Sequence, residues 1–148
     1  MSATFLQVFV HIVWSTFQRR PMLTDDVEKV VHAAIQDECR ALKCPPVAIG
    51  GTADHVHVLV SLSASVSLAT LVQQAKGVSA HLLTHRLAPA ASFRWQRGYS
   101  AFSLRKTELD AVRQYVLHQK QRHHARALVS DWEIIDDIPG RPNSRSSR

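Results

Sequence analysis

The sequence predicts an α+β domain built on a four-stranded antiparallel sheet. Four segments are rich in β-branched and aromatic residues, which favour strands. Two amphipathic stretches with helical spacing separate these segments, and a third follows the last of them. The chain has 148 residues, of which 45% are hydrophobic. It is therefore long enough to form one domain with a sizeable core.

The N-terminal third predicts a strand, a basic loop and a helix. The strand comprises residues 5–14, FLQVFVHIVW, and is expected to be buried on at least one face. The loop carries the adjacent cations Arg19 and Arg20. Thr24 is placed to cap a helix that ends near Leu42.

The middle of the chain predicts two neighbouring strands and a second helix. Residues 44–51, CPPVAIGG, are entered through two prolines and left through two glycines, and residues 55–62, HVHVLVSL, follow closely. This spacing predicts a hairpin. Ser67 is placed to cap a helix from Leu68 to about Leu87.

The last third predicts the fourth strand and a third helix. The strand is expected in the second half of residues 93–104, FRWQRGYSAFSL, and Thr107 is placed to cap a helix that reaches about Ala127. Residues 1–135 are expected to form the domain, and residues 136–148 a flexible tail. The resulting order, β-α-β-β-α-β, is that of ferredoxin-like and RRM-like folds, with an added C-terminal helix near the open sheet face.

Composition favours a polyanionic partner such as nucleic acid. The chain has 18 Lys and Arg against 12 Asp and Glu, which gives a net charge of +6. Cys39 and Cys44 lack the spacing of a disulfide framework or a zinc knuckle and are expected to be reduced thiols. The apolar run at residues 5–14 is too short to span a membrane and contains His11, and no signal peptide is recognisable. We therefore expect a soluble, cytoplasmic protein.

Two histidines interrupt the otherwise apolar strand HVHVLV. Because strand side chains alternate, His55 and His57 are expected on the same open face, about 6.5–7 Å apart. Neutral imidazole binds several divalent ions, so the pair is a candidate metal site. Two polar residues on the solvent side of an amphipathic strand would show the same pattern. Asp54 is expected on the opposite face and is not counted as a ligand.

The last predicted helix offers a further ligand and a nucleophile. Tyr115 and Gln119 are four residues apart and therefore share one side of a helix. The Gln119 amide oxygen suits Mg²⁺ or Mn²⁺, and the Tyr115 phenol could form a covalent intermediate. A tyrosine packed on the sheet beside a solvated glutamine would fit the same spacing.

Together these motifs resemble the small single-tyrosine HUH transposases of bacterial insertion sequences, a family that includes the REP-associated tyrosine transposases. That family has a His-hydrophobe-His strand and a helix with Tyr, then Gln four residues later, then a His pair. HIVWSTFQRRPML and FRWQRGYSAFSL are also similar to its basic loop and aromatic segment, so the likeness covers residues 5 to about 132. The matching motif positions are His55, Val56, His57, Tyr115, Gln119, His123 and His124.

The resemblance implies a metal-dependent transposase that nicks and rejoins single-stranded DNA near hairpin ends. Tyr115 would attack the phosphate and leave a 5′-phosphotyrosine, and no ATP would be needed. His55, His57 and Gln119 would hold Mg²⁺ or Mn²⁺. Members commonly form homodimers in which one subunit's tyrosine helix completes the partner's histidine pair, and the sequence leaves open whether this chain acts in cis, in trans or as a monomer.

Basic and aromatic side chains are candidates for contacts with the DNA. Trp95 and Tyr99 could stack on bases, although a core position is equally compatible with each of them. His118 departs from the family pattern, since many relatives have Asn before the Gln, and it could alter substrate contacts. The candidate backbone contacts are Arg19, Arg20, Lys76, Arg94, Arg97, Arg105, Lys106, Arg122, His123 and His124.

Three other functions remain compatible with the sequence. A domesticated relative would apply the same chemistry to repeated palindromic elements of its host genome. A non-catalytic binder of single-stranded nucleic acid would be expected to have aromatic residues on the middle strands, and residues 47–62 contain none. A zinc-dependent hydrolase of small substrates would more often use a carboxylate or a third histidine as ligand.

Overall fold

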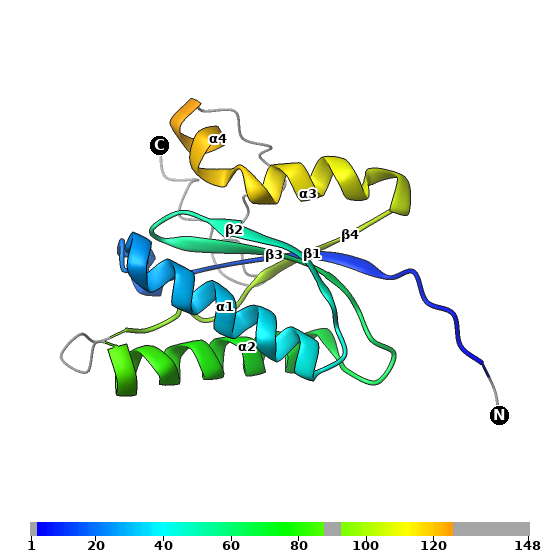
Figure 1. Cartoon of the computed structure of the whole chain (residues 1–148), viewed down its shortest axis with the longest axis horizontal. Coiled ribbons are helices and arrows are strands. Elements are labelled where there is room, and N and C mark those ends of the chain that lie inside the picture. The colour runs from blue at the N-terminus through cyan, green and yellow to red at the C-terminus, as the bar shows by residue number, and fades with distance from the viewer. Residues whose placement is uncertain (1–2, 88–92, 126–148) are drawn as a thin grey trace, which may run out of the picture.

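The computed structural model describes residues 3–87 and 93–125, and shows a four-stranded antiparallel sheet (Figure 1). The spatial order is β2-β3-β1-β4, so β1 and β3 are the central strands. This architecture confirms the predicted α+β class and its ferredoxin-like strand order. The strands are β1 (Phe9–Ser15), β2 (Pro46–Gly51), β3 (His55–Ser61) and β4 (Ser100–Leu104).

Helices cover both faces of the sheet (Figure 1). α1 (Asp25–Ala41) and α2 (Leu68–Leu82) lie on one face, and α3 (Leu109–Leu117) and α4 (Gln119–Ala125) lie on the other. Short helical turns occur at Phe17–Arg19, Leu83–Leu87 and Lys106–Glu108. An open histidine-bearing face was expected from the sequence. This expectation was wrong, because the C-terminal helices pack on that face.

The main core lies between the sheet and the first two helices. Alternate residues of the central strands, among them Ile12, Val56 and Val58, pack there against Val31 and Ile35 of α1. The core also holds Cys39 and Cys44, which are free buried thiols, as expected. Among the described residues, no helix has the length and apolar character needed to cross a membrane.

Two predicted boundaries differ at the N-terminal strand and the second helix. β1 begins at Phe9 rather than Phe5, because its ladder partners on β3 and β4 begin opposite Phe9. α2 begins as predicted, with the Ser67 hydroxyl accepting a hydrogen bond from the Thr70 N–H. It ends at Leu82 and continues only as a π-helical turn.

The prediction of one continuous C-terminal helix is wrong. Its first turn is a 3₁₀ helix capped at Arg105 rather than Thr107, with the Arg105 N–H donating to the Glu108 carboxylate at 2.9 Å. The helix then breaks at His118, where φ is −110° and ψ is 31°. The predicted helix end, the domain end at residue 135 and the predicted tail lie outside the described residues.

Candidate active site

The two strand histidines lie side by side beneath the C-terminal helices. His55 and His57 project from the same face of β3, and both are completely buried. Their ring centroids are 5.0 Å apart. The helices cover them because Leu59 of β3 packs with Val112 and Val116 of α3 in a second, smaller core.

A glycine lets α3 lie directly on the sheet. Gly50 of β2 is paired with His57, and a Cβ atom added at Gly50 would lie 1.9 Å from the Val116 carbonyl oxygen. No real Cβ contact is this short, so any side chain here would push the helix away. The close approach depends on this one missing methyl group, and it brings α3 down beside the histidines.

Asp54 anchors His55. The Nδ1–H of His55 donates to the Asp54 carboxylate at 2.7 Å, and the Thr52 hydroxyl donates to the same oxygen at 3.0 Å. Burial raises the pKa of Asp54, but the hydrogen bond from His55 and the cation of Arg19, 3.4 Å away, outweigh it and hold the pKa well below its usual range. The expected orientation of Asp54 was wrong, because β3 begins only at His55 and strand alternation does not reach residue 54.

His57 is anchored by another histidine. Its Nδ1 lies 2.8 Å from Nε2 of His11 on β1, and the two rings stack at 5.0 Å with planes 26° apart. His11 was not among the predicted site residues, since one histidine in an apolar strand indicates no partner. Two signals in the sequence favoured a buried position on the histidine face: His11 alternates with the apolar Ile12, and it lies in a strand expected to be buried.

Tyr115 of α3 is buried against this histidine group. The centroid of its ring lies 5.9 Å from that of His57 and 6.4 Å from that of His11, in edge-to-face arrangements. The Arg122 guanidinium lies 4.7 Å from the Tyr115 ring centroid. Tyr115 therefore lies beside two imidazoles and a cation of the same chain.

Gln119 reaches the histidine pair through His123. Gln119 is completely buried, and its side-chain amide donates to the Tyr115 carbonyl at 3.1 Å. Its amide oxygen lies 3.1 Å from Nε2 of His123, whose ring centroid is 4.8 Å from that of His55. Within the described ranges, no group of three or more His, Cys, Asp or Glu residues is arranged to hold a metal ion. A third protein ligand beside the pair would therefore be of another type, such as the Gln119 amide.

His118 ends α3. Its backbone N–H and its imidazole both lie within hydrogen-bonding distance of the Gln114 carbonyl oxygen, at 3.1 and 2.8 Å. This double contact satisfies a carbonyl at the helix end. The imidazole is exposed, so the residue at which the chain departs from the family pattern serves locally as a cap for the tyrosine helix.

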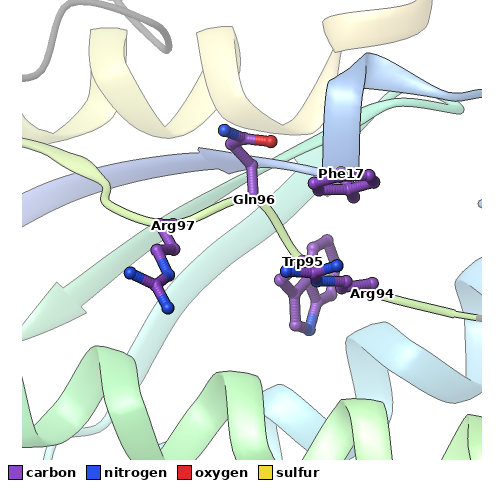
Figure 2. Close-up of a pocket in the computed structure, with 5 residues that line it drawn as sticks. All are labelled: Phe17, Arg94, Trp95, Gln96 and Arg97. Carbon is purple, nitrogen blue, oxygen red and sulfur yellow. The ribbon is translucent and has the colours of Figure 1, made fainter. Parts of the chain in front are cut away.

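Several predicted DNA contacts gather at a cleft of about 230 Å³ (Figure 2). Phe17, Arg94, Gln96 and Arg97 line it together with Trp95. The Arg94 guanidinium lies 4.4 Å from the centroid of the Phe17 ring. Two loops far apart in sequence thus meet to form an arginine-rich wall.

Trp95 does not fit its expected role in base stacking. It is 8% exposed, and its indole N–H donates to the Ser79 hydroxyl at 3.0 Å. Trp14 and Phe93 pack edge-on against it, with centroids 5.9 and 4.8 Å away. These contacts place Trp95 in the main core, from which it also lines the cleft.

The other predicted contacts are distributed over several elements. Lys76 of α2 donates to the Gln96 and Gly98 carbonyls at 2.8 and 2.6 Å, and burial lowers its pKa to about 8. Tyr99 lines a second cleft beside Lys76. Besides Arg94 and Arg97 at the cleft, the exposed members of the predicted set are Arg20, Arg105, Lys106 and His124.

Comparison with known proteins gives a consistent result. The family described as "Transposase IS200 like" matches residues 4–119. A Deinococcus radiodurans R1 protein described as a candidate transposase has 20% identity and a TM-score of 0.63, over 78% of this chain and 94% of its own. The REP-associated tyrosine transposase bound to a REP hairpin has 17% identity and a TM-score of 0.62, over 90% and 81%. No curated protein sequence matches the chain.

Proposed function

The chain belongs to the family of IS200-like transposases, and from this we propose that it nicks and rejoins single-stranded DNA near hairpin ends through a 5′-phosphotyrosine. The observation that carries the proposal is the burial of Tyr115 beside His57, with 5.9 Å between the ring centroids. A phenol beside paired imidazoles is placed to act as a nucleophile at a metal-bound phosphate. The structural likeness to a transposase bound to a REP hairpin supports a hairpin-containing substrate.

We assign Mg²⁺ or Mn²⁺ to His55, His57 and Gln119. The Nδ1 atoms of both histidines are engaged, by Asp54 and by His11, so Nε2 would be the ligating atom. Metal-bound histidines typically have such a second hydrogen bond, and an amide oxygen suits a hard cation. A bound ion would act as a Lewis acid on the scissile phosphate.

Tyr115 carries the covalent step. Its oxygen forms a bond to phosphorus while the bond from phosphorus to the 3′ oxygen breaks. The phenol loses its proton and the departing oxygen gains one, which leaves a 5′-phosphotyrosine and a 3′-hydroxyl. The Arg122 guanidinium, 4.7 Å from the ring centroid, favours the developing negative charge. Attack by another 3′-hydroxyl reverses the step, so no ATP is required.

Access to the site requires a movement of the C-terminal helices. Tyr115 is 1% exposed, and both strand histidines are completely buried. We assign the movement to α4, which the break at His118 separates from α3. We propose that the chain acts in cis, which the position of Tyr115 beside His57 of the same chain supports, and the homodimer implied by the family resemblance would pair two such chains.

The cleft shown in Figure 2 would guide the DNA strand. Arg94 and Arg97 line it, and Arg19 links the neighbouring loop to Asp54 and through it to His55. Cations in such a groove bind the phosphate backbone without regard to sequence. The arginine-lined cleft is thus joined to His55, the proposed metal ligand, through the contacts of Arg19 and Asp54.

The reaction is tested with labelled single-stranded DNA from the flanks of the gene in the presence of Mn²⁺. We expect a denaturation-resistant protein–DNA adduct that disappears in Tyr115→Phe. Tyr99→Phe changes the only other tyrosine of the chain and should retain the adduct. Undiminished adduct in Tyr115→Phe would remove the nucleophile assignment, and binding without any adduct in the wild type would favour a non-catalytic binder.

The same assay separates a mobile transposase from a domesticated relative. The REP-hairpin-bound structure gives a reason to test repeated palindromic elements beside the flanking DNA. Cleavage of the flanks indicates the mobile form. Cleavage confined to palindromes elsewhere in the genome indicates the domesticated form.

A further inference from the structure

His11 is a buried histidine to which the reaction described above gives no role of its own. It lies on the central strand β1 opposite Leu59 of β3 and Phe102 of β4. Only 1% of it is exposed. A polar ring buried to this extent is costly unless it is hydrogen-bonded. The 2.8 Å contact with Nδ1 of His57 is such a bond, and it joins two strands through the histidine face of the sheet.

The direction of this hydrogen bond decides what His57 can do. If Nε2–H of His11 donated, Nδ1 of His57 would accept and a neutral His57 would carry its proton on Nε2. That nitrogen could not then ligate a metal. If Nδ1–H of His57 donates, Nε2 of His57 keeps its lone pair. Only the second direction is compatible with a ligand at this position.

His55 has an unambiguous anchor, and His57 does not. The Asp54 carboxylate lies 2.7 Å from Nδ1 of His55 and 3.4 Å from the Arg19 side chain, and a carboxylate can only accept from His55. His11 is able to donate or accept, so His57 depends on the tautomer of its neighbour. The two ligands of one ion would therefore have chemically different supports.

We propose that His11 is a positioning residue that accepts the Nδ1–H hydrogen bond of His57 and so holds His57 in the tautomer and orientation that bind a divalent metal. The ring of His11 is itself held by Phe102, 5.9 Å away, and by Tyr115, 6.4 Å away, between centroids. The imidazole of His11 thus neighbours both the proposed metal ligand His57 and the proposed nucleophile Tyr115. This role rests on the metal-binding function proposed for His57.

The first test measures Mn²⁺ affinity by calorimetry without DNA. His11→Leu removes the acceptor and should weaken binding by about tenfold or more, as loss of a supporting partner does in other metal sites. His11→Gln places an amide oxygen near the former Nε2 and should recover most of the affinity. Wild-type affinity in a folded His11→Leu protein would overturn the proposal, as would failure of the wild type to bind Mn²⁺.

The second test reads the tautomer directly from ¹⁵N–¹H ring correlations of the metal-free protein at about pH 8, where imidazole is neutral. We expect His57 to carry its proton on Nδ1 in the wild type and in His11→Gln. Population of the Nε2–H form is expected in His11→Leu. A predominant Nε2–H form in the wild type would overturn the proposal even if the leucine variant did not fold.

These measurements separate the role of His11 from the nicking reaction. Neither of them involves DNA or cleavage. A protein that binds Mn²⁺ in a His11-dependent way but forms no DNA adduct would overturn the proposed reaction and support the role of His11. If the wild type forms the DNA adduct but His11→Leu binds Mn²⁺ as tightly as the wild type, the proposed reaction would be supported and the role of His11 overturned.

Discussion

The side chains around Tyr115 form a polar group inside an otherwise apolar interface. His11, His55, His57 and Gln119 are each at most 1% exposed, and each has a hydrogen-bonding partner in its neighbourhood. Buried polar groups without partners would destabilise the fold, whereas a connected network holds its members in fixed positions. The burial of these residues therefore supports a preorganised site rather than incidental core histidines.

Lys76 makes a prediction about stability and pH. Burial lowers its pKa from 10.5 to about 8. Between these two values the unfolded chain binds the proton more tightly, so the contribution of this group to the free energy of unfolding rises with pH. The neutral amine still has two N–H groups for the carbonyls of residues 96 and 98.

Urea titrations from about pH 7 to about pH 10.5, with wild type and Lys76→Met, should reveal this contribution. Stability of the wild type relative to the variant should increase across the range. A difference that stays constant or falls with pH would contradict the assignment. The comparison cancels other groups that ionise in the same range.

Among the helices and strands, the contact between α3 and β2 is the one on which the site depends. α3 brings Tyr115 to the histidines, and Gly50 permits its close approach. The break at His118 then lets α4 take its own direction, while an ion pair between Lys120 and Glu28 of α1 holds α4 against the rest of the fold. In this arrangement α3 fixes the position of Tyr115, and α4 is the part of the C-terminal region to which we assign the movement.

Substitution Gly50→Ala should separate α3 from the sheet. The added methyl group would lie 1.9 Å from the Val116 oxygen, so we expect roughly 1–3 kcal/mol of destabilisation from overpacking. A displaced Tyr115 should also reduce adduct formation by about tenfold or more, since misplacement of about 1 Å can cost about a hundredfold. Thermal unfolding and adduct kinetics measure the two effects.

Gly77→Ala is the matched control. A Cβ at Gly77 meets no atom within 4 Å, and this glycine lies within α2. Alanine there should stabilise the helix by up to about 1 kcal/mol and leave adduct formation unchanged. Equal behaviour of the two variants would show that the approach of α3 does not depend on Gly50.

For the chain as a whole, the larger apolar core and the candidate active site lie on opposite faces of the sheet. α1 and α2 cover one face of the sheet, and α3 and α4 cover the other (Figure 1). The larger apolar core lies on the first face, and the buried His55 and His57 lie on the second with the smaller core. The net charge of +6 includes the arginines of the cleft in Figure 2. A positively charged groove of this kind would attract a phosphate backbone.

Binding to a DNA hairpin should therefore weaken with salt. The logarithm of the association constant should fall linearly with the logarithm of salt concentration, and Arg94→Gln should reduce the slope by about 0.7 to 0.9 if it removes one phosphate contact. Lys29→Gln changes an exposed cation on α1, away from the cleft, and should leave the slope as in the wild type. Fluorescence anisotropy over a salt series provides the measurement, and an unchanged slope in Arg94→Gln would exclude it from the DNA path.

The sequence by itself determined the features that depend on local periodicity. Alternation placed His55 and His57 on one face, and a four-residue spacing put Tyr115 and Gln119 on one side of the C-terminal helical region. Strand and helix patterns likewise predicted the element order and the fold class. These signals are local because each follows from the geometry of one strand or one helix turn.

Only the tertiary structure decided which of these groups meet. The hydrogen bond between His11 and His57 joins residues 46 positions apart and arises from the pairing of β1 with β3. The covering of the histidine face depends on how α3 packs on the sheet, and α3 ends at His118, whose backbone N–H and imidazole both lie near the Gln114 carbonyl oxygen. Asp54 reaches His55 because it precedes the first residue of β3, so strand alternation does not fix the direction of its side chain. Contacts between distant segments depend on strand register and packing, which no single stretch of sequence records.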